Sequence, residues 1–256
     1  MNEVKVLILR GPGTNCDAET AFAFQKAGAG TFLCHINQLI RHDRRLSDYQ
    51  VLVIPGGFVY GDDIAAGKVL ANELKLKLGD DIRLFVEKGG LILGICNGFQ
   101  VMAKAGILPD LNNQTAPPLT LATNDSGKFE CRWVHLQVEK KNPCVFTQGI
   151  HHMYLPVAHG EGKVITDMRG LREINAVLYY TDEAGSVQAG YPHNPNGSMN
   201  NIAGVCDPTG RIFALMPHPE RHVRFTQHPE WTRKKPREAG DGLAIFQNAV
   251  KWAKGK

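Results

Sequence analysis

A cysteine at position 96 stands in a pattern that is typical of an enzyme nucleophile. Residues 94–98 read GICNG, with one glycine two residues before the cysteine and another two residues after it. This is the G-x-S-x-G nucleophile elbow with cysteine in place of serine, and its glycines permit a strained strand-to-helix turn that pushes the side chain outward. The helix behind the turn presents its N-terminus to the sulfur, which favours the thiolate anion. Cys96 is therefore a candidate nucleophile, and the alternative is a buried cysteine among closely packed glycines.

A histidine near the end of the chain is the candidate base for this thiol. Residues 216–220 read MPHPE, so that prolines on both sides stiffen the backbone of His218. In an extended segment residues two apart point the same way, which would place Glu220 beside His218. The carboxylate could then hold one imidazole nitrogen while the other nitrogen faces Cys96. A His-Pro-Glu sequence alone is weak evidence, but paired with the elbow it is strong.

Attack of a thiolate on a carbonyl carbon builds an oxyanion, which requires hydrogen-bond donors. The backbone N–H of Asn97, directly after the nucleophile, is one expected donor. The sequence Pro55-Gly56-Gly57 follows a neighbouring apolar run, and its glycines let backbone N–H groups approach closely. We expect the second donor there, and the alternative is a simple turn.

A second cysteine, Cys16, competes with Cys96 on local chemistry. It lies in the stretch GPGTNCD, residues 11–17, which also follows an apolar run and precedes a helical pattern. Cys16 has no glycine two residues before it or two after it, so it lacks the tight elbow. We interpret residues 11–17 as a glycine-rich loop that borders the site of Cys96 and has no catalytic role of its own.

The elements that must position these residues alternate along the first hundred residues. Short runs that are apolar throughout predict buried strands at residues 4–9, 31–36, 51–54 and 91–95. Helical spacing predicts helices at residues 17–27, at 98–105, and around Leu74 to Phe85 with an interruption at Gly79. Such alternation indicates an α/β fold with a mostly parallel sheet and helices on both faces. The three glycine-rich stretches all follow strands, so they meet at the carboxyl edge where such sheets hold their chemistry.

The second half of the sequence is typical of antiparallel additions. Strands are predicted at residues 129–138, 176–180, 202–205 and 211–215, with CDPTG as a turn before the last of them. Residues 242–253 form an amphipathic pattern and predict a terminal helix. Residues 107–128 are rich in Pro, Asn, Thr and Asp and are predicted to be a loop. No internal repeat or linker separates these parts, so we expect a single domain over residues 1–256.

Composition excludes several classes of protein. Hydrophobic residues make up 43% of the 256 residues, which favours a globular fold with a buried core. The formal net charge of +4 is too small to indicate a nucleic-acid partner. No apolar run approaches the ~20 residues of a membrane span, and the N-terminus lacks the pattern of a signal peptide. Six single cysteines without a C-x-x-C pair indicate free thiols and a cytoplasmic setting.

Neither the histidines nor the basic residues form a strong binding pattern. The chain has ten histidines, but beside the pair at 151–152 no ligand cluster has the spacing of a zinc site. We therefore expect no metal. The basic stretch RKKPR, residues 233–237, is interpreted as a solvated loop, and a patch that faces a partner is the alternative.

Taken together, the motifs resemble those of the class I glutamine amidotransferase family. The class-wide features are PGG, the G-x-C-x-G-x-Q elbow and a late H-P-E. A narrower set is similar to one branch, the glutaminase subunits of phosphoribosylformylglycinamidine synthases in purine biosynthesis. This set follows the order of that branch along almost the whole chain and comprises GPGTNCD (11–17), VIPGGFVYGDD (53–63), GICNGFQ (94–100), PVAHGEG (156–162), YPHNPNGS (191–198), NIAGV (201–205) and MPHPER (216–221).

The resemblance implies a flavodoxin-like fold of three layers and a role for each matched residue. Cys96 would form a γ-glutamyl thioester, His218 would transfer protons, and Glu220 would orient His218. Gly57 and Asn97 would form the oxyanion hole. Contacts to glutamine would come from six further residues: Gly56, Phe58, Gln100, His159, Gly160 and Glu161. For Gln100 the alternative is an ordinary helix glutamine, and for the His159 to Glu161 stretch it is a polar turn.

The resemblance also implies partners. Ammonia would pass to a synthetase subunit that converts formylglycinamide ribonucleotide to formylglycinamidine ribonucleotide with ATP and Mg²⁺, and a small accessory subunit would complete the complex. No cofactor is expected on this chain, which fits the lack of a Walker-type G-x-x-x-x-G-K-[ST] sequence. Neither nucleic acid nor membrane is an expected partner.

The sequence departs from the family in a few places, and alternatives stay open. Val59 stands where the family usually has serine and Ala65 where a basic residue is frequent, and extra residues occur near 139–153 and 222–241. These departures concern partner contacts. Another glutaminase, or a free-standing cysteine hydrolase of similar topology, is the main alternative. A flavodoxin-like nucleotide-binding module with residues 11–13 as phosphate cradle would leave the elbow and His-Pro-Glu unexplained.

Overall fold

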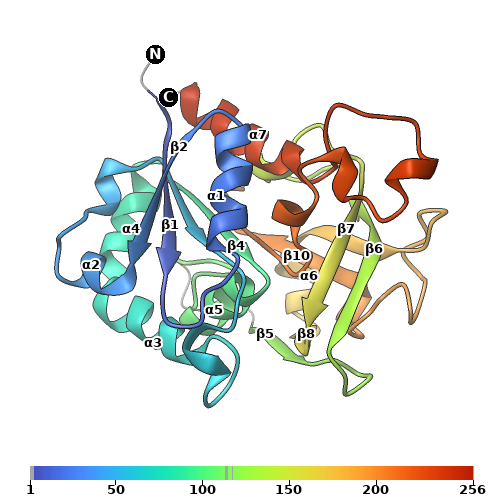
Figure 1. Ribbon diagram of the computed structural model, residues 1–256. Helices are drawn as coiled ribbons and strands as arrows, with labels where there is room; N and C mark the ends of the chain where they lie inside the picture. Colours follow the sequence, from blue (N-terminus) through green and yellow to red (C-terminus); the bar gives the residue numbers. More distant parts are fainter. Residues whose placement is uncertain (1–2, 113–114, 117, 256) are drawn as a thin grey trace.

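A single nine-stranded sheet runs through the computed structural model, which describes residues 3–112, 115–116 and 118–255 (Figure 1). The order of the strands across the sheet is β2 (Gly30–His35), β1 (Lys5–Arg10), β3 (Val51–Ile54), β4 (Leu91–Ile95), β11 (Ile212–Leu215), β10 (Ile202–Cys206), β9 (Asn175–Thr181), β6 (Glu130–Val138) and β7 (His152–His159). A second sheet pairs β5 (Leu119–Thr123) with β8 (Glu161–Thr166).

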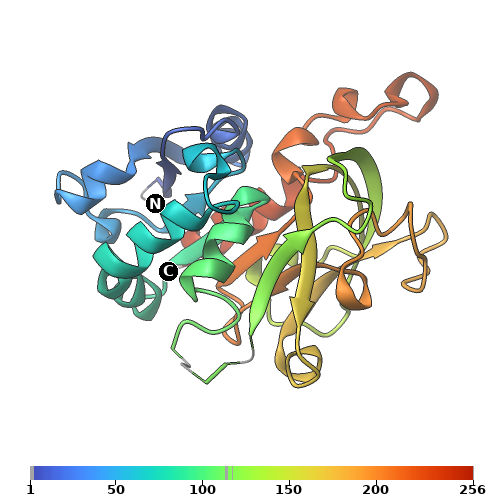
Figure 2. The same cartoon turned by 90° about the horizontal axis from the view of Figure 1, so that it is seen from below.

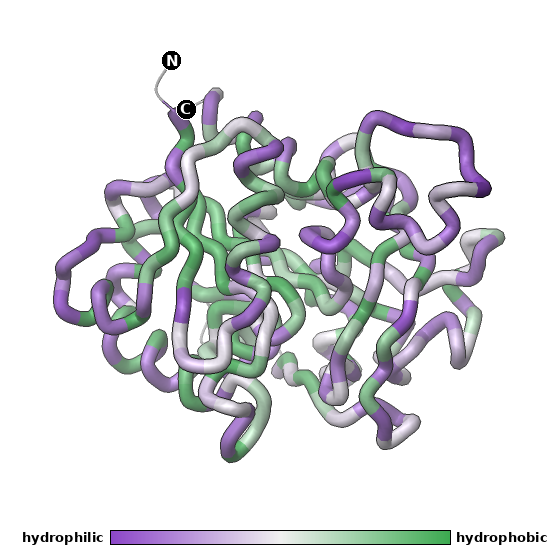
Figure 3. Tube along the Cα trace, viewed as in Figure 1, coloured by the Kyte–Doolittle hydropathy of each residue, from purple (hydrophilic) through white to green (hydrophobic). Residues whose placement is uncertain are grey.

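The five adjacent strands β2, β1, β3, β4 and β11 run parallel to one another and form the core of the molecule. Every residue of β3, β4 and β11 is buried, as expected for strands that are covered on both faces. Figure 3 shows these strands as a green, hydrophobic centre within a purple outer layer. The carboxyl ends of β1, β3 and β4 therefore meet at one edge, where the three glycine-rich stretches begin.

Helices cover both faces of the parallel strands (Figure 2). On one face α1 (Asp17–Lys26) packs against α7 (Leu243–Lys254), with the rings of Phe24 and Phe246 centred 5.0 Å apart. On the other face lie α3 (Lys68–Lys77), α4 (Gly79–Glu87) and α5 (Asn97–Ala105). The predicted layers are thus confirmed. Shorter elements complete the chain: α2 (Ile36–Ile40), α6 (Gly170–Glu173), and the 3-10 turns Leu46–Asp48, Val59–Asp62, Val145–Thr147, Met199–Asn201, Pro219–Arg221, Phe225–Gln227 and Trp231–Arg233.

The remaining strands continue the sheet in antiparallel pairs from β11 through β10, β9 and β6 to β7. Three of the observed strands differ from the predictions. Residues 107–128 were expected to be a loop, which is wrong for β5, and neither β7 nor β8 was predicted. In β7 and β8 burial alternates residue by residue, and a proline in β7 and a glycine in β8 weaken the strand pattern.

The segment 222–241, which was expected to be an addition to the family pattern, packs against the antiparallel half. The ring of Trp133 lies 5.1 Å from that of His222 and 5.8 Å from that of His228. The carboxylate of Asp241 accepts a hydrogen bond from the backbone N–H of Tyr154 at 2.9 Å. The segment therefore packs on β6 and β7 directly after the turn that carries His218. Among the described residues no helix combines the length and apolar character that crossing a membrane requires.

Candidate active site

Cys96 occupies a strained turn between β4 and α5. Its backbone has φ 51° and ψ −104°, a conformation that is costly for a residue with a side chain. Its N–H donates to the carbonyl of Leu215 in β11 at 2.8 Å, which ties the turn to the neighbouring strand. A Cβ on Gly98 would lie 1.9 Å from the carbonyl oxygen of Ile54, so only glycine lets α5 approach β3 this closely. The elbow geometry that the sequence predicts is therefore present.

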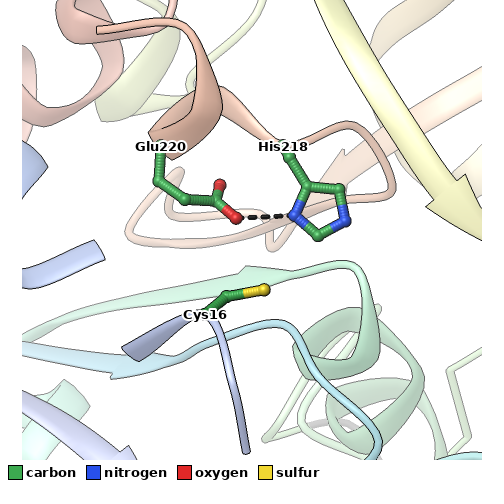
Figure 4. Close-up of side chains that lie close together, drawn as sticks. All are labelled: Cys16, His218 and Glu220. Atoms are coloured by element: carbon green, nitrogen blue, oxygen red, sulfur yellow. Dashed lines mark hydrogen bonds and ion pairs between the residues drawn. The ribbon is translucent and has the colours of Figure 1, made fainter. Parts of the chain in front are cut away.

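His218 and Glu220 form a buried pair. His218 Nδ1 and Glu220 Oε1 lie 2.6 Å apart, and both residues are at most 2% exposed. The backbone at Pro219–Arg221 is a 3-10 turn, so the expectation of a fully extended segment is wrong. The side chains meet because an extended His218, with φ −104° and ψ 91°, leads directly into the turn. Figure 4 shows the two groups joined by this hydrogen bond.

The second imidazole nitrogen of His218 is left free for chemistry. Nδ1 donates to the carboxylate, and Nε2 is buried without a hydrogen-bond partner among the described residues. Burial alone would lower the pKa of His218, but the charge of Glu220 and the sulfur of Cys96 outweigh it, so that the pKa is raised well above its usual value. A base whose one nitrogen is held by a carboxylate and whose ring interacts with a thiol is arranged for proton transfer.

Strand β7 holds the nucleophile and the base in relation to each other. The backbone N–H of His218 donates to the carbonyl of Pro156 at 2.8 Å. The thiol of Cys96 donates to the carbonyl of Ala158, two residues further along the same strand, at 3.6 Å. Both contacts are made with β7. This strand of the antiparallel half therefore holds the base, His218, in place relative to the nucleophile, Cys96, which belongs to the parallel half.

The glycines after β3 line the space in front of the elbow. Gly57 has φ 147°, and a Cβ there would lie 2.9 Å from the backbone of Gly13 and Asn15. A Cβ on Gly56 would lie 2.9 Å from Cε1 of His218. Phe58 donates its N–H to the carbonyl of Gly13 at 3.0 Å, so residues 56–58 are fixed against the first glycine-rich loop. This arrangement fits an oxyanion strand at Gly57.

Cys16 also lies close to His218. Its sulfur would be 3.1 Å from a Cβ on Gly56, and it accepts a hydrogen bond from Nη2 of Arg221 at 3.2 Å. In Figure 4 the sulfur points toward the ring beneath Glu220. Burial raises the pKa of the Cys16 thiol. The first glycine-rich loop therefore borders the site, as expected, and it supplies a neutral thiol next to the base.

Cys16, His218 and Glu220 also have the side-chain types of a metal site. One ligand atom from each lies within 4.8 Å of the others, and no other such group of three occurs in the described part of the chain. Two of the three groups are already hydrogen-bonded to each other, and the guanidinium of Arg221 places a positive charge at the sulfur of the third. Since this charge repels a cation, we interpret the trio as a hydrogen-bonded unit.

The other residues expected to contact glutamine lie in two groups. Gln100 and His159 are buried and engaged by the protein: the amide of Gln100 donates to the carbonyl of Glu161, and His159 Nδ1 lies 3.1 Å from Asn124 Oδ1. Burial and the nearby His218 lower the pKa of His159 to about 4. Phe58 is half exposed, and its ring lies 6.3 Å from that of Phe129.

Phe129 is close to two of these residues. Its ring would contact a Cβ on Gly160 at 3.9 Å, so Phe58 and Gly160 both lie near the same aromatic side chain. Glu161 reaches the loop after β3, where its Oε1 accepts from the N–H of Ala66 at 3.5 Å.

Several residues of the site were not found from the sequence. Phe129, Asn124 and Arg221 contact predicted site residues, but each lies in a segment whose partner is distant in the sequence. Arg221 stands in the quoted MPHPER motif, and that motif is the signal that could have found it. Asn124 directly follows β5 and Phe129 directly precedes β6, and neither carries a pattern of its own.

If the site hydrolyses glutamine, as the motifs predict, glutamate release by Cys16→Ser should stay within about threefold of the wild-type rate, a change of less than about 1 kcal/mol in the barrier. A hydroxyl can still accept the hydrogen bond from Arg221. The measurement is labelling with an electrophilic glutamine analogue followed by peptide mapping, with Cys96→Ser as the matched variant. We expect label on Cys96 in the wild type and in Cys16→Ser, and none in Cys96→Ser; label on Cys16 would reverse the assignment.

Comparison with known proteins gives a consistent result. Residues 3–253 match the family described as the CobB/CobQ-like glutamine amidotransferase domain. The chain is 56% identical over 254 residues to the phosphoribosylformylglycinamidine synthase subunit PurQ of Dehalococcoides mccartyi, covering 99% of each chain. It is 44% identical over 264 residues to the subunit of the same name from Methanococcus maripaludis, covering 97% of each. A chain in the structure of PurLQS from Thermotoga maritima is 31% identical, with a TM-score of 0.75 and coverage of 98% of this chain and 99% of that chain.

Proposed function

The chain belongs to the CobB/CobQ-like glutamine amidotransferase family, and from this premise we propose that it is the glutaminase subunit of a phosphoribosylformylglycinamidine synthase. It hydrolyses glutamine to glutamate and ammonia, and the ammonia serves the conversion of formylglycinamide ribonucleotide to formylglycinamidine ribonucleotide in purine biosynthesis. The observation that carries the proposal is the elbow cysteine Cys96, which contacts the same strand, β7, as His218, whose imidazole a buried carboxylate holds.

In the proposed reaction His218 accepts a proton and gives it up again in each of two half-reactions. The sulfur of Cys96 attacks the side-chain amide carbon of glutamine, and His218 accepts the thiol proton. The oxyanion lies against the backbone N–H groups of Gly57 and Asn97. The C–N bond breaks as His218 protonates the leaving nitrogen, which departs as ammonia and leaves a γ-glutamyl thioester. Water then attacks the thioester, His218 takes its proton, and glutamate leaves as the thiol re-forms.

We assign two kinds of role to the residues that surround this centre. Gly56 keeps the space next to His218 clear of a side chain, and Phe58 and Gly160 line the entrance for glutamine. The carboxylate of Glu161 binds the amino group of the substrate glutamine. Gln100 and His159 act indirectly, because the amide of Gln100 already donates to the carbonyl of Glu161 and the ring of His159 already binds the side chain of Asn124.

We also propose the partners that the reaction needs. Ammonia passes to a synthetase subunit that binds ATP and Mg²⁺, together with a small accessory subunit. Support comes from the relatives, which are named as synthase subunits, and from the similar chain in the PurLQS structure. We place the complex in the cytoplasm, since all six cysteines are free, as is usual in a reducing compartment.

The proposal predicts that glutamine hydrolysis depends on the partner. We expect glutaminase activity of the isolated chain to be low and to rise about 5- to 150-fold when the synthetase, the accessory subunit and their substrates are added, which is the usual range of coupling between sites. Glutamate release with and without the partner measures this. Equal rates would contradict the subunit role and favour the free-standing cysteine hydrolase.

A further inference from the structure

We infer that Asp62 and the side chain of Asn97 tie the oxyanion strand to the elbow helix and thereby position Gly57 for catalysis. This inference deepens the proposed function and rests on it. Neither side chain is expected to touch glutamine. Both are positioning residues that act through the backbone of residues 57–59.

The side chain of Asn97 joins the two places that are expected to supply oxyanion donors. It is 2% exposed, and its Oδ1 accepts a hydrogen bond from the N–H of Val59 at 3.2 Å. Its Nδ2 donates to Oδ1 of Asp62 at 3.2 Å and to Oε1 of Gln100 at 2.8 Å. Asn97 directly follows Cys96, and Val59 lies two residues after Gly57. The side-chain amide of Asn97 therefore links the elbow at Cys96 to the glycine strand at Gly57.

The loop that follows Gly57 has a strained backbone, which such a tie helps to hold. Three residues with side chains have backbones in the left-handed region: Tyr60 with φ 56°, Asp62 with φ 54° and Ile64 with φ 72°. Each such residue costs about 1–3 kcal/mol, and the cost is highest for a branched side chain such as Ile64. The side chain of Ile64 cannot offset this by packing, because it is 88% exposed.

The carboxylate of Asp62 spans the strained loop. The same Oδ1 that binds Asn97 also accepts the N–H of Gly67 at 3.3 Å, so one oxygen fixes both ends of residues 62–67. The charged groups that face it are Glu161 and Lys104, whose effects oppose each other, and burial raises the pKa of Asp62.

A second set of contacts holds the same loop. Lys104 Nζ donates to the carbonyl of Ala66 at 2.6 Å and lies 3.4 Å from Oε2 of Glu161. The hydroxyl of Tyr60 donates to Glu73 in α3 at 2.7 Å. These contacts hold other parts of the loop, whereas the side chain of Asn97, directly after the nucleophile, binds both Val59 and Asp62.

The test uses the reconstituted complex with four variants. Asn97→Ala and Asp62→Ala remove the tie, and Asp62→Asn keeps an acceptor oxygen in place. Asp63→Ala changes the next, exposed residue of the same loop and is the matched control. Because loss of one oxyanion donor costs about 10²–10³ in kcat, we expect its displacement to cost about 10- to 100-fold in the two alanine variants, with KM changed less than about threefold. Asp62→Asn should recover most of the rate, and Asp63→Ala should match the wild type.

A second measurement separates positioning from simple damage to the fold. Alkylation of Cys96 by iodoacetamide builds no oxyanion, so its rate should stay at the wild-type value in every variant. The γ-aldehyde of glutamate instead reacts with the sulfur of Cys96 to form a tetrahedral thiohemiacetal. The affinity of the complex for this aldehyde should fall by the same factor as kcat. The inference is overturned if both alanine variants keep the wild-type kcat, or if alkylation slows in parallel with hydrolysis. Failure of the proposed function would be seen separately, as a wild-type complex that does not use glutamine.

Discussion

Replacing Cys96 by alanine is expected to abolish glutamine-dependent synthesis by the reconstituted complex and to leave ammonia-dependent synthesis intact. Removal of a covalent nucleophile costs about 10⁴-fold or more, because the remaining groups cannot form the thioester. Ammonia supplied in the buffer bypasses this step and reaches the synthetase directly. The measurement is formation of the amidine product with glutamine or with an ammonium salt as nitrogen source.

The ammonia reaction serves as the control for folding and assembly. Cys96 is 5% exposed, and the lost sulfur leaves only a small cavity, so the subunit should still bind its partner. An equal loss of both reactions would show that Cys96 is structural. An unchanged reaction with glutamine would transfer the role of nucleophile to another thiol, and Cys16 is the neighbour that the structure offers.

Replacing Glu220 by glutamine is expected to lower kcat by up to about 10⁴-fold, the loss found when the orienting carboxylate of a triad is neutralised. The amide has the same shape but no charge to stabilise the imidazolium. Because the charge of Glu220 helps to raise the pKa of His218, its loss should move the titration of this imidazole to lower pH. The proton on His218 stabilises the native state at low pH, and this contribution is lost as the pH rises through the raised pKa.

Two measurements test this variant. The glutaminase rate of the complex gives the loss in kcat, and NMR titration of the His218 ring gives the direction of the pKa change. An exposed carboxylate replaced in the same way, Glu173→Gln on α6, is the matched control and should change neither quantity. A wild-type kcat in Glu220→Gln would show that the 2.6 Å contact is structural. An unshifted titration of His218 would show that its charge is stabilised by other groups.

The parallel half and the core of the candidate site could be predicted from the sequence. The strands β3 and β4 have the predicted bounds, because a short, continuous apolar run that leads into a glycine-rich turn has few other interpretations. The elbow at Cys96 has a local cause, since glycines at fixed offsets permit the turn. The pairing of His218 with Glu220 was also expected, although it depends on a 3-10 turn that the two prolines did not indicate.

The rest depends on contacts between residues that are far apart in the sequence. Strand β5 has alternating burial in a polar stretch, and its pairing with β8 supplies the order that its own residues do not. The position of Arg221 follows from Cys16 and Glu19, about two hundred residues earlier in the chain. The hydrogen bonds of Asn97 likewise depend on the conformation of the loop after Gly57. The residue types of that loop do not predict its strained backbone.

The place of β11 in the sheet has a consequence for synthesis on the ribosome. β11 lies beside β4, yet residues 96–211 separate the two strands in the chain. A nascent chain therefore exposes an unpaired, apolar edge of β4 until residues 212–215 have emerged, and such edges invite aggregation. The N–H of Cys96 also finds its acceptor, the carbonyl of Leu215, only then. We expect prematurely released chains to be targets for chaperones and proteases, and to release no ammonia into the cell.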